Sequence, residues 1–242
     1  MTEALEAHLR RQIEHSSRFF WHRLRWRVVR GYLPEARPFE LVDVGAGAGL
    51  LGAFLGHDRP QAAYRFVEPI DSLRAYLRER YGNAADAGDA TTYPAARFVT
   101  LLDVLEHQED DRAFLSSLVS KMAPGSTLLL TVPALPKLWS QWDVALGHFR
   151  RYDKATLLAC TEGLPLTVHE TSFLFPEMVP LGMLRTRRKH TPTPGITGDD
   201  AEFPDLPRVV NDVLYTAGTA SVSLRRKWGT GTSIFLAATL DD

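Results

Sequence analysis

Residues 41–55 read LVDVGAGAGLLGAFL, and this stretch decides the fold. An apolar run ends at Asp43, glycines follow at the alternate positions 45, 47 and 49, and a leucine-rich helical pattern then begins. Glycine reaches positive φ and lets a ligand approach the main chain closely. A buried strand, a glycine turn and a helix N-terminus together form a corner typical of nucleotide binding.

Outward from this corner, strand and helix patterns alternate. Strands are predicted at 40–44, 64–68, 84–88, 97–103, 126–132, 165–173 and 232–240. Helices are predicted at 3–32, 49–57, 71–81, 109–122, 154–162 and around 209–214. This order predicts an α/β fold with a Rossmann-like, doubly wound and mostly parallel sheet.

The same pass along the chain predicts one domain over residues 1–242. An N-terminal helical cap is expected at 1–36. The long, irregular segment 174–229, which contains TPTPGITGDD, is expected to fold over the end of the sheet as a lid before the last strand.

Composition narrows the functional classes. The chain has 242 residues, 45% of them apolar, and a net charge of −1, which gives no general attraction to nucleic acid or anionic membrane. Cys160 is the only cysteine, which suits a reducing cytoplasm. The N-terminus lacks a signal-peptide pattern, and no apolar run approaches the roughly 18 residues of a spanning helix. We therefore expect a cytoplasmic protein that inserts into no membrane and binds no nucleic acid.

Acids at the strand ends indicate which nucleotide is bound. The glycine spacing disfavours a standard NAD corner. Glu68 ends the second strand, where a carboxylate can accept both hydroxyls of a ribose. Asp89 follows the third predicted strand and could meet an adenine amino group, and Asp103 ends the fourth in LLDVLEH.

These pieces resemble class I S-adenosylmethionine-dependent methyltransferases. The matching segments are LVDVGAGAG, FVEP, GDA, LLDVLEH and APGSTLLLTVP, in that order over residues 38–133. The resemblance implies a seven-stranded sheet with an antiparallel last strand, and S-adenosylmethionine as cofactor. It also implies that Asp43 and the glycine loop hold the methionine moiety, Glu68 the ribose and Asp89 the adenine. The cofactor-binding residues implied in full are Asp43, Gly45, Ala46, Gly47, Gly49, Glu68, Pro69, Asp89, Ala90 and Asp103.

The acceptor should meet the segments that leave the fourth and fifth strands, which are DVLEHQEDD at 103–111 and ALPKLWSQWDVALGHFRRYD at 134–153. The second segment resembles a bacterial methyltransferase subgroup with a GHxRRY pattern, which is associated with glycan or natural-product pathways. His148 is a candidate general base, because its ordinary pKa lies near neutral pH. Tyr152 is the second catalytic candidate. The candidate substrate-binding residues are His107, Trp139, Trp142, Arg150 and Arg151.

Each of these candidates has a structural alternative. His148 could fix its loop by hydrogen bonds. Trp139 and Trp142 could stack on a flat acceptor or belong to the core of the cap. Arg150 and Arg151 could hold an anionic substrate or pair with the acids at 109–111.

A metal site is a further alternative for one cluster. Asp103, Glu106 and His107, with His148 downstream, resemble the ExxEH…H pattern of metal-assisted small-RNA and quinone-pathway O-methyltransferases. Asp103 stands where that pattern has glutamate, which shortens the reach, so we expect no metal.

The resulting prediction is an enzyme that transfers a methyl group from S-adenosylmethionine to a small molecule, with oxygen as the expected acceptor atom, in secondary-metabolite or glycan biosynthesis. Two rival hypotheses keep the cofactor. In one, the sulfonium undergoes another reaction, such as intramolecular displacement. In the other, the chain is a catalytically silent partner subunit.

Overall fold

The computed structural model describes residues 6, 9, 18–88, 90–187 and 206–242, in which six strands form one sheet. The strands are β1 (Phe39–Val44), β2 (Ala62–Val67), β3 (Ala96–Leu102), β4 (Thr127–Pro133), β5 (Leu166–Leu174) and β6 (Ser233–Leu240). Their order is β2-β1-β3-β4-β6-β5. Strands β1 to β4 are parallel, and β6 is antiparallel to both β4 and β5. The predicted α/β architecture and the antiparallel last strand are confirmed.

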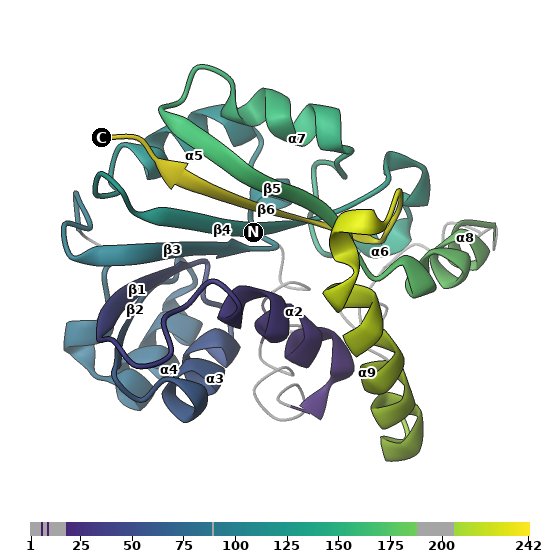
Figure 1. Cartoon of the computed structure of the whole chain (residues 1–242), viewed down its shortest axis with the longest axis horizontal. Helices are drawn as coiled ribbons and strands as arrows, with labels where there is room; N and C mark the ends of the chain where they lie inside the picture. Colours follow the sequence, from purple (N-terminus) through teal and green to yellow (C-terminus); the bar gives the residue numbers. More distant parts are fainter. Residues whose placement is uncertain (1–5, 7–8, 10–17, 89, 188–205) are drawn as a thin grey trace.

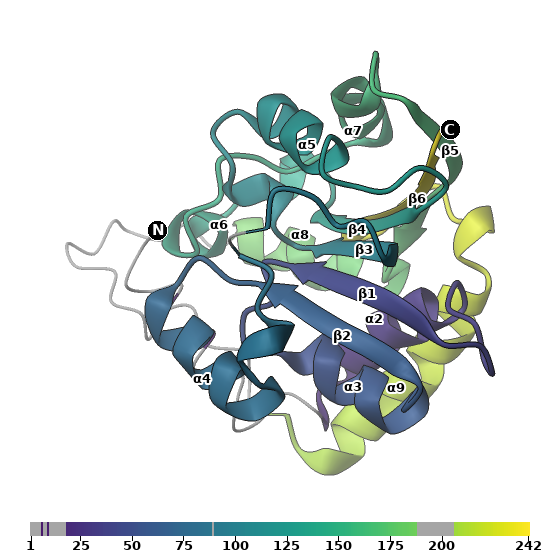
Figure 2. The ribbon, with the colours of Figure 1, turned by 90° about the vertical axis from the view of Figure 1, so that its left-hand side faces the viewer.

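Helices cover both faces of this sheet (Figures 1 and 2). One face carries α5 (Asp111–Val119) and α7 (Lys154–Thr161), and the other carries α2 (Phe20–Arg30), α3 (Leu50–Asp58) and α9 (Arg208–Ser223). The central strand β4 is buried along almost its whole length, so its run of leucines and valine packs on both sides. Two hydrophobic clusters, one on each face, form the core.

The predicted strand at 84–88 does not form, so the described sheet has six strands where seven were expected. Residues Asn83–Ala85 are a 3-10 helix, and a single bridge joins Phe66 to Asp86. The cause is local. The Asp86 carboxylate accepts hydrogen bonds from Nε of Arg74 at 2.5 Å and Nε of Arg78 at 2.6 Å. Both arginines lie on α4 (Asp71–Tyr81), so side chains of this helix hold the segment in place of a strand ladder.

Three helix predictions differ from the structure in length. Of the helix predicted at 3–32, most of the N-terminal part lies outside the described residues, and α2 is the part the structure describes. Helix α5 begins later than predicted because the Asp110 side chain caps it, accepting the Ala113 amide at 2.9 Å. Helix α9 is longer than the short helix predicted near 209–214.

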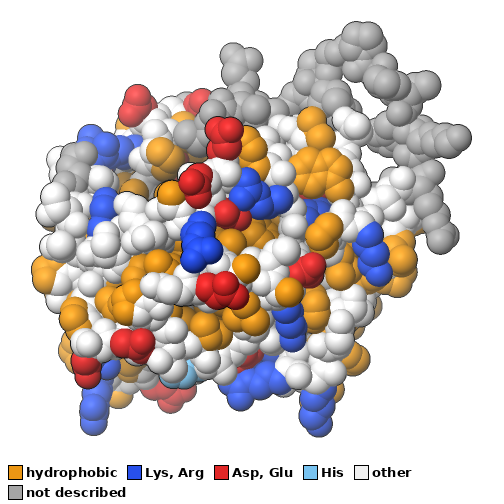
Figure 3. All heavy atoms as spheres, turned by 90° about the horizontal axis from the view of Figure 1, so that it is seen from above, with side chains coloured by type: hydrophobic (Ala, Val, Ile, Leu, Met, Phe, Trp, Pro, Cys, Tyr) orange, Lys and Arg blue, Asp and Glu red, His pale blue; other side chains and the backbone are white. Residues whose placement is uncertain are grey.

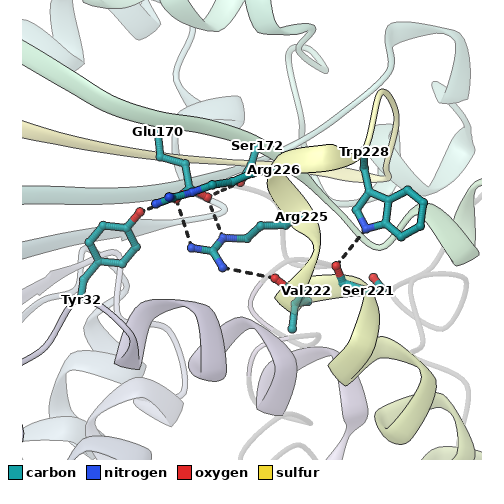
Figure 4. Close-up of polar contacts among 8 residues, drawn as sticks. All are labelled: Tyr32, Glu170, Ser172, Ser221, Val222, Arg225, Arg226 and Trp228. Carbon is teal, nitrogen blue, oxygen red and sulfur yellow. Dashed lines mark hydrogen bonds and ion pairs between the residues drawn. The ribbon is translucent and has the colours of Figure 1, made fainter.

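The segment predicted as a lid returns to the sheet through a buried carboxylate, Glu170 on β5 (Figure 4). Glu170 accepts two hydrogen bonds from Arg225, at 2.6 and 3.1 Å, and one from Arg226 at 2.7 Å. Tyr32 and Ser172 donate to it at 2.6 and 2.7 Å. Burial disfavours the charge, but these donors outweigh it and lower the pKa of Glu170 to about 2. The network ties the end of the lid segment to β5 and to the chain after α2.

The face of the molecule drawn in Figure 3 carries no continuous stripe of like-charged side chains among its described residues. Over the face that carries α5 and α7, acidic and basic side chains are mixed with apolar ones (Figure 3). Among the described residues, no helix is both long and apolar enough to cross a bilayer.

Candidate functional site

A cavity of about 420 Å³ opens at the carboxyl ends of the parallel strands. This is the edge at which ligands bind in open α/β sheets. The turns after β1, β2 and β3 form one side of the cavity. The 134–153 segment, α2 and the lid segment contribute the other side.

The glycine loop needs glycine for two separate reasons. Gly45, Gly47 and Gly49 have φ of 73°, 54° and 70°, a region that strains other residues. In addition, a Cβ at position 45 would stand 2.5 Å from Cγ2 of Val104, well inside van der Waals contact. Bare backbone is therefore required at the cavity wall, as predicted.

Asp43 lies beneath this loop and faces the cavity. Its side chain is 3% exposed and accepts hydrogen bonds from the Thr100 hydroxyl at 2.8 Å and the Tyr64 hydroxyl at 3.0 Å. Burial raises the pKa of Asp43 to about 6, although both hydroxyls lower it. The two donors fix the orientation of the carboxylate.

Glu68 joins the glycine loop to the turn after β2. Its two oxygens accept the Gly47 amide at 2.7 Å and the Ile70 amide at 2.9 Å. Burial raises the pKa of this carboxyl to about 6 against the effect of those amides. A carboxylate has about four lone-pair sites, so two remain for ligand hydroxyls.

Asp103 lines the cavity, and both of its carboxylate oxygens have partners. Its backbone has φ of 57°, an uncommon value for a non-glycine residue. One carboxylate oxygen pairs with Arg25 from α2, and the other accepts the Thr131 hydroxyl at 2.9 Å. Arg25 was not predicted, because no local pattern links residues 78 positions apart.

His148 is oriented by a buried acid that the sequence analysis also missed. Nδ1 of His148 lies 3.0 Å from Oδ1 of Asp143, and Nε of Arg151 donates to the same oxygen at 2.7 Å. Burial opposes the charge of Asp143, but His148 and Arg151 outweigh it and lower its pKa. Ser140 and Asp143 also form a capping box at the start of α6 (Gln141–Ala145), so the S-x-x-D pattern could have marked Asp143 as a helix-capping acid, but not as the partner of His148.

Three potential ligands for a cation meet beside this pair. Glu106, His107 and His148 each offer one ligand atom, and these atoms lie within 4.8 Å of one another. The rings of His107 and His148 are edge to face with centroids 4.7 Å apart. Glu106 is 1% exposed, and burial, followed by the charge of Asp103, raises its pKa well above the ordinary value.

The structure brings most of the predicted site residues to the cavity wall. Those lining it are Asp43, Gly45, Ala46, Gly47, Glu68, Pro69, Asp103, His107, Trp142, His148 and Arg151. The cavity wall does not include Gly49, Ala90, Trp139, Arg150 or Tyr152, and Asp89 lies outside the described residues.

Two of the predicted residues that do not line the cavity, Arg150 and Tyr152, have partners elsewhere. Arg150 pairs with Asp111 at 2.7 Å, which confirms the alternative that it contacts the acids at 109–111. Tyr152 is buried, and its hydroxyl donates to Asp111 at 2.8 Å, a contact that, after burial, raises its pKa further. Its prediction as a catalytic residue therefore conflicts with its position. Arg151 lines the cavity but is neutralised by Asp143.

Apolar residues from distant segments complete the cavity. The cavity is lined by Phe19 and Trp21 at the start of α2, Leu138 after β4, and Met178 and Leu214 of the lid segment. Trp21 stacks on Phe175 at 3.9 Å between centroids. Their convergence depends on tertiary packing, and the sequence analysis did not identify them.

A family model described as a methyltransferase domain matches residues 9–171. No curated protein sequence matches significantly.

Solved structures share the fold at low sequence identity. A chain of the Haloferax volcanii complex between the methyltransferase activator Trm112 and its partner has a TM-score of 0.59 and 12% identity, covering 92% of this chain and 91% of that one. Phosphoethanolamine N-methyltransferase 2 of Haemonchus contortus has a TM-score of 0.56 and 14% identity, covering 92% of this chain and 53% of its own. An Archaeoglobus fulgidus SAM-dependent methyltransferase has a TM-score of 0.53 and 14% identity, covering 90% and 94%. At such identities the similarity shows the fold.

Proposed function

The chain belongs to the methyltransferase domain family, and from this premise we propose that it transfers the methyl group of S-adenosylmethionine to an oxygen atom of a small, uncharged acceptor. S-adenosylmethionine is the methyl donor. The observation that carries the proposal is the joint position of the glycine loop and His148 on the wall of one cavity. The glycine loop can hold the cofactor, and His148 can contact the acceptor.

The cofactor half of the proposal uses Asp43, the glycine loop and Glu68. Main-chain groups at Gly45 and Gly47 approach the ligand without side chains between. The free lone pairs of Glu68 accept the ribose hydroxyls, and the negative charge of Asp43 lies near the cationic methionine moiety. Asp89 keeps its proposed role at the adenine edge, and Ala90 and Pro69 their proposed places in the cofactor site.

The acceptor half is apolar with a few polar groups. Trp142 and Met178 offer surface to a flat or hydrocarbon acceptor. The cavity-lining arginines, Arg25 and Arg151, are each paired with an aspartate, which disfavours an anionic acceptor. An uncharged hydroxyl compound from secondary-metabolite or glycan biosynthesis fits this environment.

His148 activates the acceptor oxygen in this proposal. Methyl transfer from a sulfonium is an in-line displacement, so alignment in a water-poor site supplies much of the rate. A hydroxyl acceptor must also lose its proton. The Asp143 carboxylate orients the imidazole of His148 so that Nε2 is available to meet that hydroxyl.

We place the covering elements in the same proposal. In this proposal the N-terminal part at 1–36 is a cap and the segment 174–229 is a lid that excludes water, although residues 1–5, 7–8, 10–17 and 188–205 of these segments lie outside the described residues. In support, α8 (Val179–Arg187) and α9 both contribute cavity-lining residues, Leu181 and Leu214.

Product analysis tests the proposal. The protein is incubated with S-adenosylmethionine and a panel of hydroxyl, carboxylate and amine compounds, and S-adenosylhomocysteine is measured by mass spectrometry. We expect its formation with apolar hydroxyl compounds and not with matched anionic ones. A preference for anionic or amine acceptors would contradict the assignment to uncharged oxygen.

A further inference from the structure

We propose that Glu106, His107 and His148 bind one divalent transition-metal ion on the acceptor side of the cavity. The inference deepens the proposed function, because it concerns the same cavity. Binding of the ion itself does not depend on methyl transfer. It departs from the expectation of no metal, which rested on Asp103.

The spacing of the three side chains suits a cation. Bonds from a metal to nitrogen or carboxylate oxygen are about 2.0–2.2 Å long, so two ligand atoms on one ion lie about 3–4.4 Å apart. The candidate atoms lie within 4.8 Å of one another. Small rotations of side chains would bring all three onto one ion.

Glu106 supplies an independent reason for a ligand. Its Oε2 atom is buried and has no hydrogen-bond partner among the described residues. An unsatisfied carboxylate oxygen in a buried position is costly, and its presence calls for an explanation. A cation bound between Glu106 and the two imidazoles would satisfy this oxygen and compensate its charge.

His148 is already oriented as metal ligands usually are. The Asp143 carboxylate has no exposed surface and lies 3.0 Å from Nδ1 of His148, so it accepts the proton on that nitrogen. The lone pair of Nε2 is then left for coordination. A carboxylate behind a histidine fixes the tautomer and ring orientation in many metal sites.

The donor set indicates the class of ion. Arg25 and Thr131 hold the two oxygens of Asp103, so the set is one carboxylate and two imidazoles. Imidazole suits first-row ions such as iron, nickel, copper and zinc, whereas magnesium and calcium prefer oxygen. Three protein ligands leave positions open for an acceptor oxygen, whose pKa the ion would lower. With the ion bound, His148 acts as a ligand.

Metal binding can be measured without any acceptor. The chelator-treated, dialysed full chain is titrated with Mn²⁺ or Zn²⁺ by calorimetry, and loss of the free Mn²⁺ signal is followed by electron paramagnetic resonance. We expect one ion per chain. Glu106→Gln and His148→Ala should each weaken binding by at least about tenfold. Glu109→Gln and His57→Ala alter exposed residues outside the cluster, so these two variants should bind the ion with the affinity of the wild type.

Circular dichroism and S-adenosylmethionine affinity confirm that each variant is folded. Absence of stoichiometric binding to the wild type, or equal affinity in Glu106→Gln and wild type, would overturn the inference. Methyl transfer that proceeds fully in a chain without bound ion would overturn it while leaving the proposed function intact. Stoichiometric ion binding without methyl transfer would support the inference and refute the proposed function.

Discussion

Nδ1 of His148 lies 3.0 Å from Oδ1 of Asp143, and the Asp143 side chain has no exposed surface. The carboxylate holds Nδ1 of His148, and this contact fixes the orientation of the ring and therefore the position of Nε2. Arg151 shares the same oxygen at 2.7 Å, which keeps Asp143 charged. This pair links the 134–153 segment to the cavity, and it gives the first prediction.

Asp143→Asn should lower turnover by about 10- to 100-fold, because the amide orients the imidazole less firmly. S-adenosylmethionine affinity should stay unchanged, since the pair lies on the acceptor side. Initial rates of S-adenosylhomocysteine formation and calorimetry measure the two effects. Asp153→Asn is the matched control, because asparagine also caps a helix well and Asp153 lies outside the cavity wall. Loss of cofactor affinity in folded Asp143→Asn would contradict this placement.

Glu68→Ala should weaken S-adenosylmethionine binding by about tenfold or more. The substitution removes hydrogen bonds to a charged group worth about 1.5–3 kcal/mol, and it frees the Gly47 amide from its partner. Calorimetric titration of both proteins gives the ratio of dissociation constants. Glu79→Ala, an exposed change on α4, is the control. Equal affinity in a folded variant would remove Glu68 from the site.

Cofactor affinity should fall as the pH is lowered from about 8 to about 5. Burial raises the pKa of both Asp43 and Glu68 to about 6, so both carboxyls gain protons in this range. A cationic cofactor prefers their charged forms. Titrations across this pH range in wild type and Glu68→Gln check the point, and the variant should show a shallower dependence. A flat wild-type profile would mean that neither carboxyl changes charge against the cofactor.

Gly45→Ala should destabilise the loop and weaken cofactor binding. The new Cβ would stand 2.5 Å from Val104 at a φ of 73°. Gly56→Ala is the matched control, because that glycine lies within α3, at a position where a Cβ meets nothing within 4 Å. Alanine there should stabilise the helix by up to about 1 kcal/mol. The denaturation midpoint should therefore fall in Gly45→Ala and rise in Gly56→Ala. Cofactor affinity should fall only in Gly45→Ala.

Sequence reasoning predicted the parts of the site that depend on local pattern. Asp43, Gly45 and Gly47 follow directly from a strand and a turn before a helix start, and Glu68 follows from the end of the next strand. Contacts between distant segments were not accessible in this way. Arg25 reaches Asp103 from α2, and Tyr152 turns to Asp111 and not to the cavity.

The missing seventh strand has a similar cause. The residues at 84–88 carry a weak strand pattern, and the competing contacts come from Arg74 and Arg78 one turn apart on α4. Charge pairing between a helix and a later loop depends on where the helix packs. The hydrophobic pattern of residues 84–88 alone does not show where α4 packs.

Glu170→Gln should destabilise the fold by about 1–3 kcal/mol at neutral pH, because it leaves the largely buried Arg225 with a neutral partner, whereas the exposed Arg226 is screened by solvent. The folded pKa of Glu170 is about 2, below its ordinary value of 4.5. Its contribution is thus fully present above about pH 4.5 and is lost as the pH falls toward about 2. Urea denaturation at several pH values tests both statements. Glu162→Gln, an exposed change, is the control, and a difference between Glu170→Gln and wild type that persists at low pH would contradict the linkage.

The most direct test of the central claim is a reaction with S-adenosylmethionine carrying a deuterated methyl group, followed by mass spectrometry of the spent cofactor and the acceptor. The account predicts one unlabelled S-adenosylhomocysteine for each acceptor molecule that gains the labelled methyl. Consumption of the cofactor to any other sulfur product, with no label on an acceptor, would contradict methyl transfer and favour displacement on the cofactor itself.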